Sequence, residues 1–173
     1  MMNGFEKARD RRNWLEKLGE KIPGFRGYLD RELRREVDKM QRDFLASEVD
    51  RARQGLQAKI RGWSRKGVLD NLDIASTTEK LLDRLANRIR HADYGSSGFF
   101  DAVKIGEAEL EELYRFDLEL SLTVEALSGR IGDLPETPDE GSLFALLDGV
   151  EKADRFFDER STKIENVTQK GVS

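Results

Sequence analysis

Cysteine is absent from the chain, and histidine occurs once among its 173 residues. The lack of cysteine excludes disulfides, thiol nucleophiles and cysteine-ligated zinc or iron–sulfur sites. No apolar run approaches the ~18 residues that a membrane-spanning helix needs, and no secretory signal precedes the first expected helix. The sequence therefore predicts no disulfide, no metal site and no cofactor, and it favours a cytoplasmic location.

Charge is abundant and unevenly distributed. Charged residues make up 37% of the chain, against about 25% in an average domain. Residues 1–66 carry 18 Lys and Arg against 11 Asp and Glu, a net of +7, whereas residues 67–173 carry 12 against 23, a net of −11. The halves can attract each other or a second copy head to tail, and the basic half can meet nucleic acid or an anionic membrane. The alternative is that these charges lie on solvated helix faces and only keep the protein soluble.

Apolar residues recur at helical spacing through most of the chain, and no strand-like alternation is present. The expected fold is all-α, an elongated, antiparallel, coiled-coil-like bundle of four principal helices plus a short N-terminal helix, in one domain over 1–173. The segments predicted are a short helix over 4–19, a long helix over 29–66, helices over 76–93, 107–131 and 138–167, a short helix over 98–103, and a tail over 168–173.

Helix-capping patterns mark several of these boundaries. Ser76 and Glu79 have the spacing of a capping box, which predicts a helix start at Ser76. Thr137 followed by Pro138 predicts an N-cap with proline at the first helical position. Gly67 is expected to end the long helix.

The long helix is expected to bury one apolar seam. This seam comprises Leu29, Leu33, Val37, Met40, Phe44, Ala52, Leu56, Ile60 and Trp63. The 38 residues of the helix predicted over 29–66 would span about 57 Å at 1.5 Å each. Gly55 and Gly62 each cost roughly 1 kcal/mol relative to alanine, so a kink or an early end near Gly55 is the alternative. Asp38 and Arg42 are four residues apart and are expected to pair.

Asp117 stands in a seam where an apolar side chain is expected, between Leu113 and Leu120. A carboxylate there must be paired or lie at the wet margin, because an unpaired buried charge costs several kcal/mol. Arg26, Arg88 and Arg90 are the candidate partners. The structural interpretation is a buried salt bridge, and the functional alternative is a carboxylate that binds a ligand or metal.

Two glycine- and aromatic-containing loops, 22–28 and 94–102, flank an up–down pair of helices and are expected to meet at one end of the bundle. Their aromatic side chains form either a cap on the core or a recognition surface for a partner. The candidate binding residues are Arg26, Tyr28, Arg90, His91, Tyr94, Phe99, Phe100 and Asp101, together with Asp117.

Enzymatic patterns are weak. The stretch from Gly95 to Gly98 matches none of the glycine-rich phosphate-binding or nucleophile motifs, and it predicts an ordinary turn. His91 has no glutamate three residues before it, as a di-iron bundle would require. Nor do Ser96 and Ser97, so close to His91 in sequence, indicate a hydrolytic triad. We expect no catalytic residue.

Three stretches, IPGFRGY at 22–28, YGSSGFFDA at 94–102 and LYRFD at 113–117, carry a resemblance. In these the chain resembles a family of uncharacterised bacterial helical proteins over about residues 20–130. The resemblance implies a cytosolic helical protein encoded near membrane-associated band-7 or phage-shock-type stress components, and it implies no activity. The two serines at 96–97 depart from the family pattern, which has an aromatic residue there, so no ligand role carries over to them.

Three functions follow as hypotheses. The first is a non-enzymatic cytosolic scaffold that binds a protein partner or itself. The second is a stress-response factor held peripherally at the inner membrane through anionic-membrane contact. The third is an enzyme that binds a nucleotide or another small ligand. No motif indicates specific nucleic-acid binding.

Overall fold

The computed structural model describes residues 13, 15–22, 34–92 and 107–170. Four long α-helices and a short helical segment over residues 15–21 account for the regular structure of these residues. The long helices are α2 (Arg34–Arg65), α3 (Leu72–His91), α4 (Glu107–Gly132) and α5 (Glu140–Lys170). The all-α prediction is confirmed. The helix predicted over 98–103, most of the one over 4–19, residues 29–33 of the long helix, and residues 171–173 of the tail lie outside the described residues. Residues 168–170 were predicted as tail but belong to α5.

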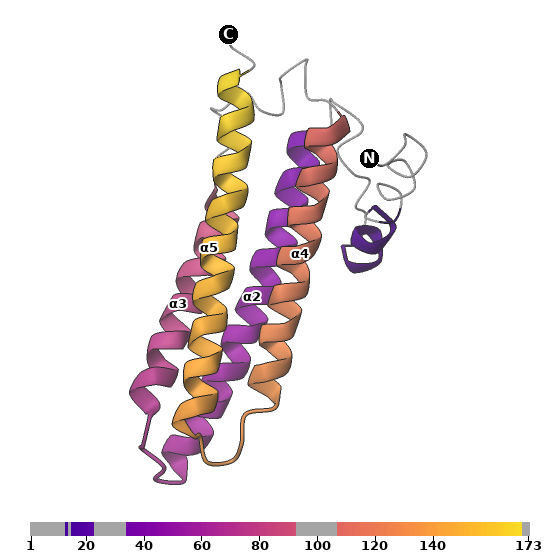
Figure 1. Ribbon diagram of the computed structural model, residues 1–173. Coiled ribbons are helices and arrows are strands. Elements are labelled where there is room, and N and C mark those ends of the chain that lie inside the picture. The colour runs from indigo at the N-terminus through magenta and orange to yellow at the C-terminus, as the bar shows by residue number, and fades with distance from the viewer. Residues whose placement is uncertain (1–12, 14, 23–33, 93–106, 171–173) are drawn as a thin grey trace.

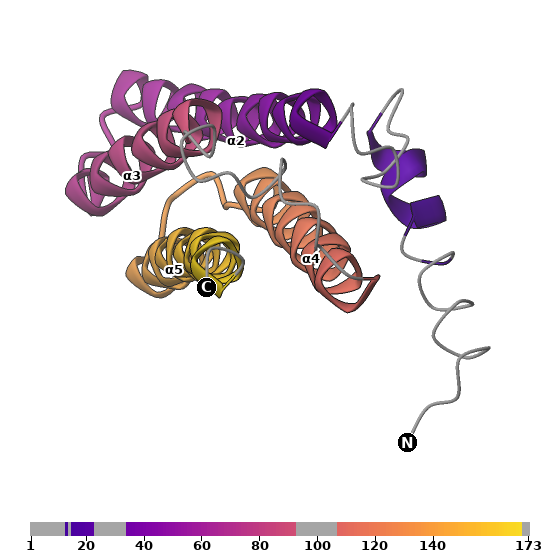
Figure 2. The ribbon, with the colours of Figure 1, turned by 90° about the horizontal axis from the view of Figure 1, so that it is seen from above.

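Consecutive helices run in opposite directions, so α2 and α4 descend in Figure 1 while α3 and α5 ascend. The packed pairs are α2 with α3, α2 with α4, α3 with α5, and α4 with α5. The helices therefore stand around the bundle in the order α2, α3, α5, α4. Two antiparallel hairpins lie side by side, and α2 lies diagonally opposite α5 (Figures 1 and 2).

The core consists of two apolar clusters. The larger includes Leu56 and Trp63 of α2 and fills the end of the bundle near the α2–α3 and α4–α5 connections. The second lies toward the other end, where Leu18 and Ile22 of the N-terminal segment pack with Leu118 of α4. Nearly complete burial of these side chains is the main favourable term in folding, at roughly 25 cal/mol per Å² of apolar surface.

The end of α2 agrees with the sequence prediction. Gly67 has a left-handed φ of 73°, its N–H donates to the Ser64 carbonyl at 3.1 Å, and the Val68 N–H donates to the Trp63 carbonyl at 3.0 Å. These two bonds define a Schellman motif, which favours glycine at the left-handed position. The helix runs without interruption through Gly55 and Gly62.

Two predicted helix starts are wrong. The third helix begins at Leu72 rather than Ser76, after Asn71 with a left-handed φ of 62°. Burial of Ala75 favours the earlier start, and Glu79 accepts hydrogen bonds from Arg53 and Gln57 of α2 instead of closing a capping box.

The fifth helix is capped by Asp139 rather than Thr137. The Ser142 N–H and hydroxyl donate to the Asp139 carboxylate at 2.7 and 2.6 Å. Pro138 consequently precedes the cap instead of occupying the first helical position.

One residue of the predicted apolar seam of α2, Met40, is not buried as the sequence predicts. Met40 is 39% exposed, and the neighbouring Gln41 is buried in its place. The reason is that this level of the bundle buries polar groups rather than apolar ones.

Candidate functional site

A layer of buried polar side chains crosses the bundle between the two apolar clusters. Asp38 and Gln41 come from α2, Asp117 from α4 and Arg160 from α5, and each is at most 1% exposed. Along α5, Arg160 stands between Phe157 of the larger cluster and Ile164 of the second. We call these four residues, together with Arg42, the ionic layer.

Arg160 joins three helices. Its Nε donates to Asp117 Oδ1 at 2.6 Å, and its Nη2 donates to Asp38 Oδ1 at 2.9 Å. The same Nη2 lies 3.5 Å from Gln41 Oε1, at the outer limit of a hydrogen bond. One planar guanidinium thereby holds carboxylates from two helices, a geometry that lysine cannot reproduce.

Arg42 connects the ionic layer to the remaining helix, α3. Its Nε donates to Asp38 Oδ2 at 2.7 Å, so the pair predicted from sequence is present, but as a part of the interior rather than of a solvated face. Its Nη1 donates to the carbonyls of Arg90 at 2.9 Å and Ile89 at 3.3 Å, in the last turn of α3. A cation is favourable at the carbonyl end of a helix.

The ionic layer contains two carboxylates and two guanidiniums, so its formal charges cancel. Charges in an apolar interior are tolerated only when paired and hydrogen-bonded. A slip of α2, α4 or α5 by one turn, about 5.4 Å, would move a charge among apolar side chains. The ionic layer therefore selects one register for these three helices.

The prediction that Asp117 is buried and contacts an arginine is confirmed. Its partner here, however, is Arg160, which was not among the three candidates. Of those, Arg88 pairs with Asp154 and Asp158, and Arg90 with Asp50 at 2.5 Å. Arg26 lies outside the described residues.

Sequence reasoning missed Arg160, although a signal for it exists. It lies three residues after Phe157 and four before Ile164, at a seam position of the same kind as that of Asp117. Two opposite charges, each interrupting the apolar seam of a different helix, would have indicated the pair. Asp38 gave no such signal, because Arg34 and Arg42 beside it are typical of a solvated face.

The other candidate residues are only partly described. Arg90 is half-buried, and His91 is exposed at the last residue of α3. Tyr28, Tyr94, Phe99, Phe100 and Asp101 lie outside the described residues, as do the loop 94–102 and all of the loop 22–28 except Ile22. The helix ends next to these loops, the start of α2 and the end of α3, lie at the same end of the bundle (Figure 1).

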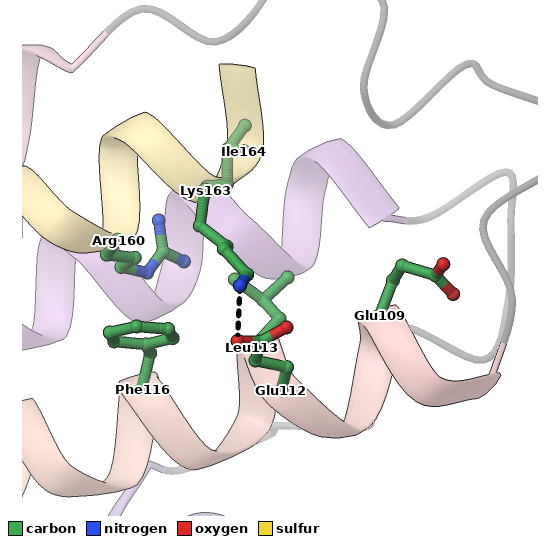
Figure 3. Close-up of a pocket in the computed structure, with 7 residues that line it drawn as sticks. All are labelled: Glu109, Glu112, Leu113, Phe116, Arg160, Lys163 and Ile164. Carbon is green, nitrogen blue, oxygen red and sulfur yellow. Dashed lines mark ion pairs between the residues drawn. The ribbon is translucent and has the colours of Figure 1, made fainter. Parts of the chain in front are cut away.

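A small cavity opens beside the ionic layer, between α4 and α5. Figure 3 shows Phe116 against Arg160, with Lys163 reaching across to Glu112, where the Nζ–Oε1 distance is 2.8 Å. The cavity volume is about 10 Å³, which is room for about one water molecule. This cavity is too small for a nucleotide.

A larger groove lies near the opposite end, between the second half of α2 and the α4–α5 connection. Its volume is about 250 Å³. We call it the α2 groove; its lining residues are Gly55, Ala58, Lys59, Gly62, Trp63, Lys66, Pro135 and Glu136.

Polar contacts fix the walls of the α2 groove. The Lys59 ammonium donates to the carbonyls of Gly132 and Leu134 at 3.2 and 2.8 Å, and the Trp63 indole donates to the Pro135 carbonyl at 3.2 Å. Lys66 pairs with Glu136, and this hydrogen bond holds the pKa of the Glu136 carboxyl below its usual range. The groove is thus closed at its base and open to solvent along α2.

Toward the other end of the bundle, the N-terminal segment covers part of α2 and α4. Val37 and Gly55, 18 residues apart, share one face of α2, and Val37 packs with Leu18 and Ile22 of the N-terminal segment. Lys21 of that segment pairs with Glu125 of α4. Figure 1 shows the short helix beside α4, below the first turns of that helix. The N-terminal segment therefore packs on the same face of α2 that lines the α2 groove further along the helix.

No group of three or more His, Asp or Glu side chains within 34–92 and 107–170 or the short N-terminal segment is arranged to hold a metal ion. In the same part of the chain, no helix is long and apolar enough to cross a membrane. Comparison with protein-family models, with curated proteins and with solved structures finds no match. The resemblance to a bacterial helical family stays a prediction.

Proposed function

We propose that this protein is a non-enzymatic helical scaffold that binds a protein partner through the α2 groove. The observation that carries the proposal is the α2 groove, together with the packing on the same face of α2. Near the start of α2 this face packs with buried leucine and isoleucine side chains of the N-terminal segment, and near its end it lines about 250 Å³ of open space.

The composition of the groove favours a helix as the partner. Apart from its chain neighbours and the backbone of its own helix, no atom of the described residues lies within 4 Å of the place where a Cβ of Gly62 would stand. Glycine in a helix interior costs about 1 kcal/mol relative to alanine, and no packing among the described residues requires it at Gly62. Close approach of another backbone is one role that glycine supports.

The membrane alternative rests on the resemblance and on the basic first third of the chain. Sedimentation with anionic vesicles at low and high salt separates it from the scaffold, because peripheral attachment through basic residues weakens as salt screens the charges. A scaffold is expected to stay in the supernatant at both salt concentrations.

Site-specific photo-crosslinking in cells tests the proposal. A photoreactive amino acid at Ala58, which lines the α2 groove, should give a discrete crosslinked product. The matched position is Gln54, which is exposed on the same helix and does not line the groove. The substitution Gly62→Leu should abolish the Ala58 product. Equal products from Ala58 and Gln54, or no product from Ala58, would refute docking in the groove.

A further inference from the structure

We infer that the α2 groove binds the exposed face of α5 around Phe144 in a second copy of this chain. This inference rests on the proposed function and names its partner. Phe144 is 49% exposed in the second turn of α5, although most large apolar side chains of the described helices are buried.

The surroundings of Phe144 are acidic. Glu140, Asp148 and Glu151 lie four before, four after and seven after it, so all three share its face of the helix. All three are exposed, and they stand against one exposed base, Arg155, on the same face. Asp148 pairs with Lys152 at 2.6 Å. We call Phe144 with these three acids the α5 knob.

The rim of the α2 groove has the opposite charge. Two bases, Lys59 and Lys66, and one acid, Glu136, line the groove, and Lys66 pairs with Glu136. An aromatic side chain with an excess of acids around it is thus complementary to a groove with an excess of bases. Complementary potentials of this kind steer association and select the partner.

The two surfaces do not meet within one copy. The helices α2 and α5 are diagonal in the bundle (Figure 2), and Phe144 is left half-exposed, so the α5 knob does not fill the α2 groove of its own copy. A contact between them joins one copy to the next and leaves a free knob and a free groove at the two ends. Such head-to-tail contacts produce open chains unless the rotation happens to close a ring.

Phenylalanine supplies the affinity in this arrangement, because buried aromatic side chains dominate interface energetics. The glycine at 62 allows the backbone of the incoming helix to approach, since a Cβ there would meet open space. The charges contribute mainly to the rate of association and to its salt dependence.

Analytical ultracentrifugation of the full chain over a series of concentrations is the first measurement. The wild-type average mass should rise continuously with concentration and fall when salt is raised. Phe144→Ala and Gly62→Leu should each be monomeric. The matched controls are Leu69→Ala, which removes another exposed apolar side chain, and Gln54→Leu, which adds a leucine to α2 outside the groove; both should associate like the wild type.

Mixing the two monomeric variants gives the decisive result. The Phe144→Ala chain keeps an intact groove and the Gly62→Leu chain keeps an intact knob, so an equimolar mixture should form a 1:1 dimer that grows no further. If Gly62→Leu loses helicity by circular dichroism, Lys66→Glu, which reverses one groove charge, replaces it in the mixture.

A wild-type chain that stays monomeric at every concentration overturns the inference, as does a mixture that stays monomeric. If the chain is monomeric while Gly62→Leu still abolishes the crosslinked product at Ala58, the partner is a different protein, and the proposed function stands without self-association. If Gly62→Leu leaves the crosslinked product at Ala58 unaffected as well, both the self-association and the docking of a partner in the α2 groove are wrong.

Discussion

Removal of Arg160 from the ionic layer should be among the most damaging single changes in the chain, and removal of its aspartate as well should restore much of the loss. Arg160→Met replaces the guanidinium by an apolar side chain of similar length. Asp117, fully buried, then loses the cation that lies 2.6 Å from its carboxylate. Breaking a buried pair by removing one partner typically costs about 3–5 kcal/mol.

The double variant separates charge from packing. In Asp117→Leu/Arg160→Met both charges of that pair are gone, while Asp38 keeps its 2.7 Å bond to Arg42. Replacing a buried ion pair by apolar side chains is often neutral or stabilising by about 1–4 kcal/mol. The double variant should therefore be more stable than Arg160→Met alone, with a coupling energy of at least about 2 kcal/mol between the two sites.

Urea denaturation followed by circular dichroism measures these differences. With a slope of about 2 kcal/mol per molar urea, a loss of about 4 kcal/mol lowers the midpoint by about 2 M. Asp117→Leu alone should cost less than Arg160→Met, because Arg160 keeps Asp38 at 2.9 Å. If Arg160→Met costs under about 1 kcal/mol, or if the double variant is as unstable as the sum of the single ones, the ionic layer does not hold the helices together as described.

Three further predictions concern the helix ends and the groove. The hydrogen bonds from the Ser142 hydroxyl and N–H hold the pKa of the Asp139 carboxyl below its usual value. The cap therefore stabilises the protein above the unfolded pKa of about 3.9, and this contribution is lost as the pH falls through the lowered pKa of the folded state. Melting temperatures of wild type and Asp139→Ala should differ at pH 6 and converge at strongly acid pH, and a difference that stays constant refutes the assignment. Arg42→Met should accelerate amide hydrogen exchange in the last turn of α3, where Arg42 binds two carbonyls, and unchanged exchange there would show that the contact is dispensable. Gly62→Ala should raise the free energy of unfolding by up to about 1 kcal/mol, since the site is open; a loss of stability in urea denaturation would show that Gly62 is packed more tightly than described.

Local signals predicted the elements better than they predicted where these elements begin. Gly67 ended α2 as expected, because a left-handed C-cap depends on glycine within one turn of the chain. The start of α3 was misplaced by four residues, because burial of Ala75 outweighs the capping box that Ser76 offers. Thr137 and Asp139 are both acceptable N-caps, and local sequence does not decide between them.

The candidate site was predicted in part. An acid in an apolar seam is visible in sequence, and it led to Asp117. Its partner lies 43 residues away on α5, and the choice of this arginine over Arg88 or Arg90 depends on the helix order around the bundle. That order follows from how the two hairpins stack, which the periodicity of single helices does not encode. The α2 groove was missed for the same reason, since Pro135 and Gly62 meet only through the packing of α2 on α4.

The arrangement of the ionic layer has a consequence for how the protein folds. Each hairpin, α2 with α3 and α4 with α5, is closed by a short connection, so its contacts are local and form quickly. Asp117 and Arg160 belong to the same hairpin, whereas Asp38 belongs to the other. The first pair can therefore neutralise itself before the hairpins meet, and Asp38 reaches Arg160 only when they dock. Docking of the two preformed hairpins should therefore be a late step in folding, and it requires the hairpins to be aligned. Substitutions at Asp38 should slow folding less than they speed unfolding.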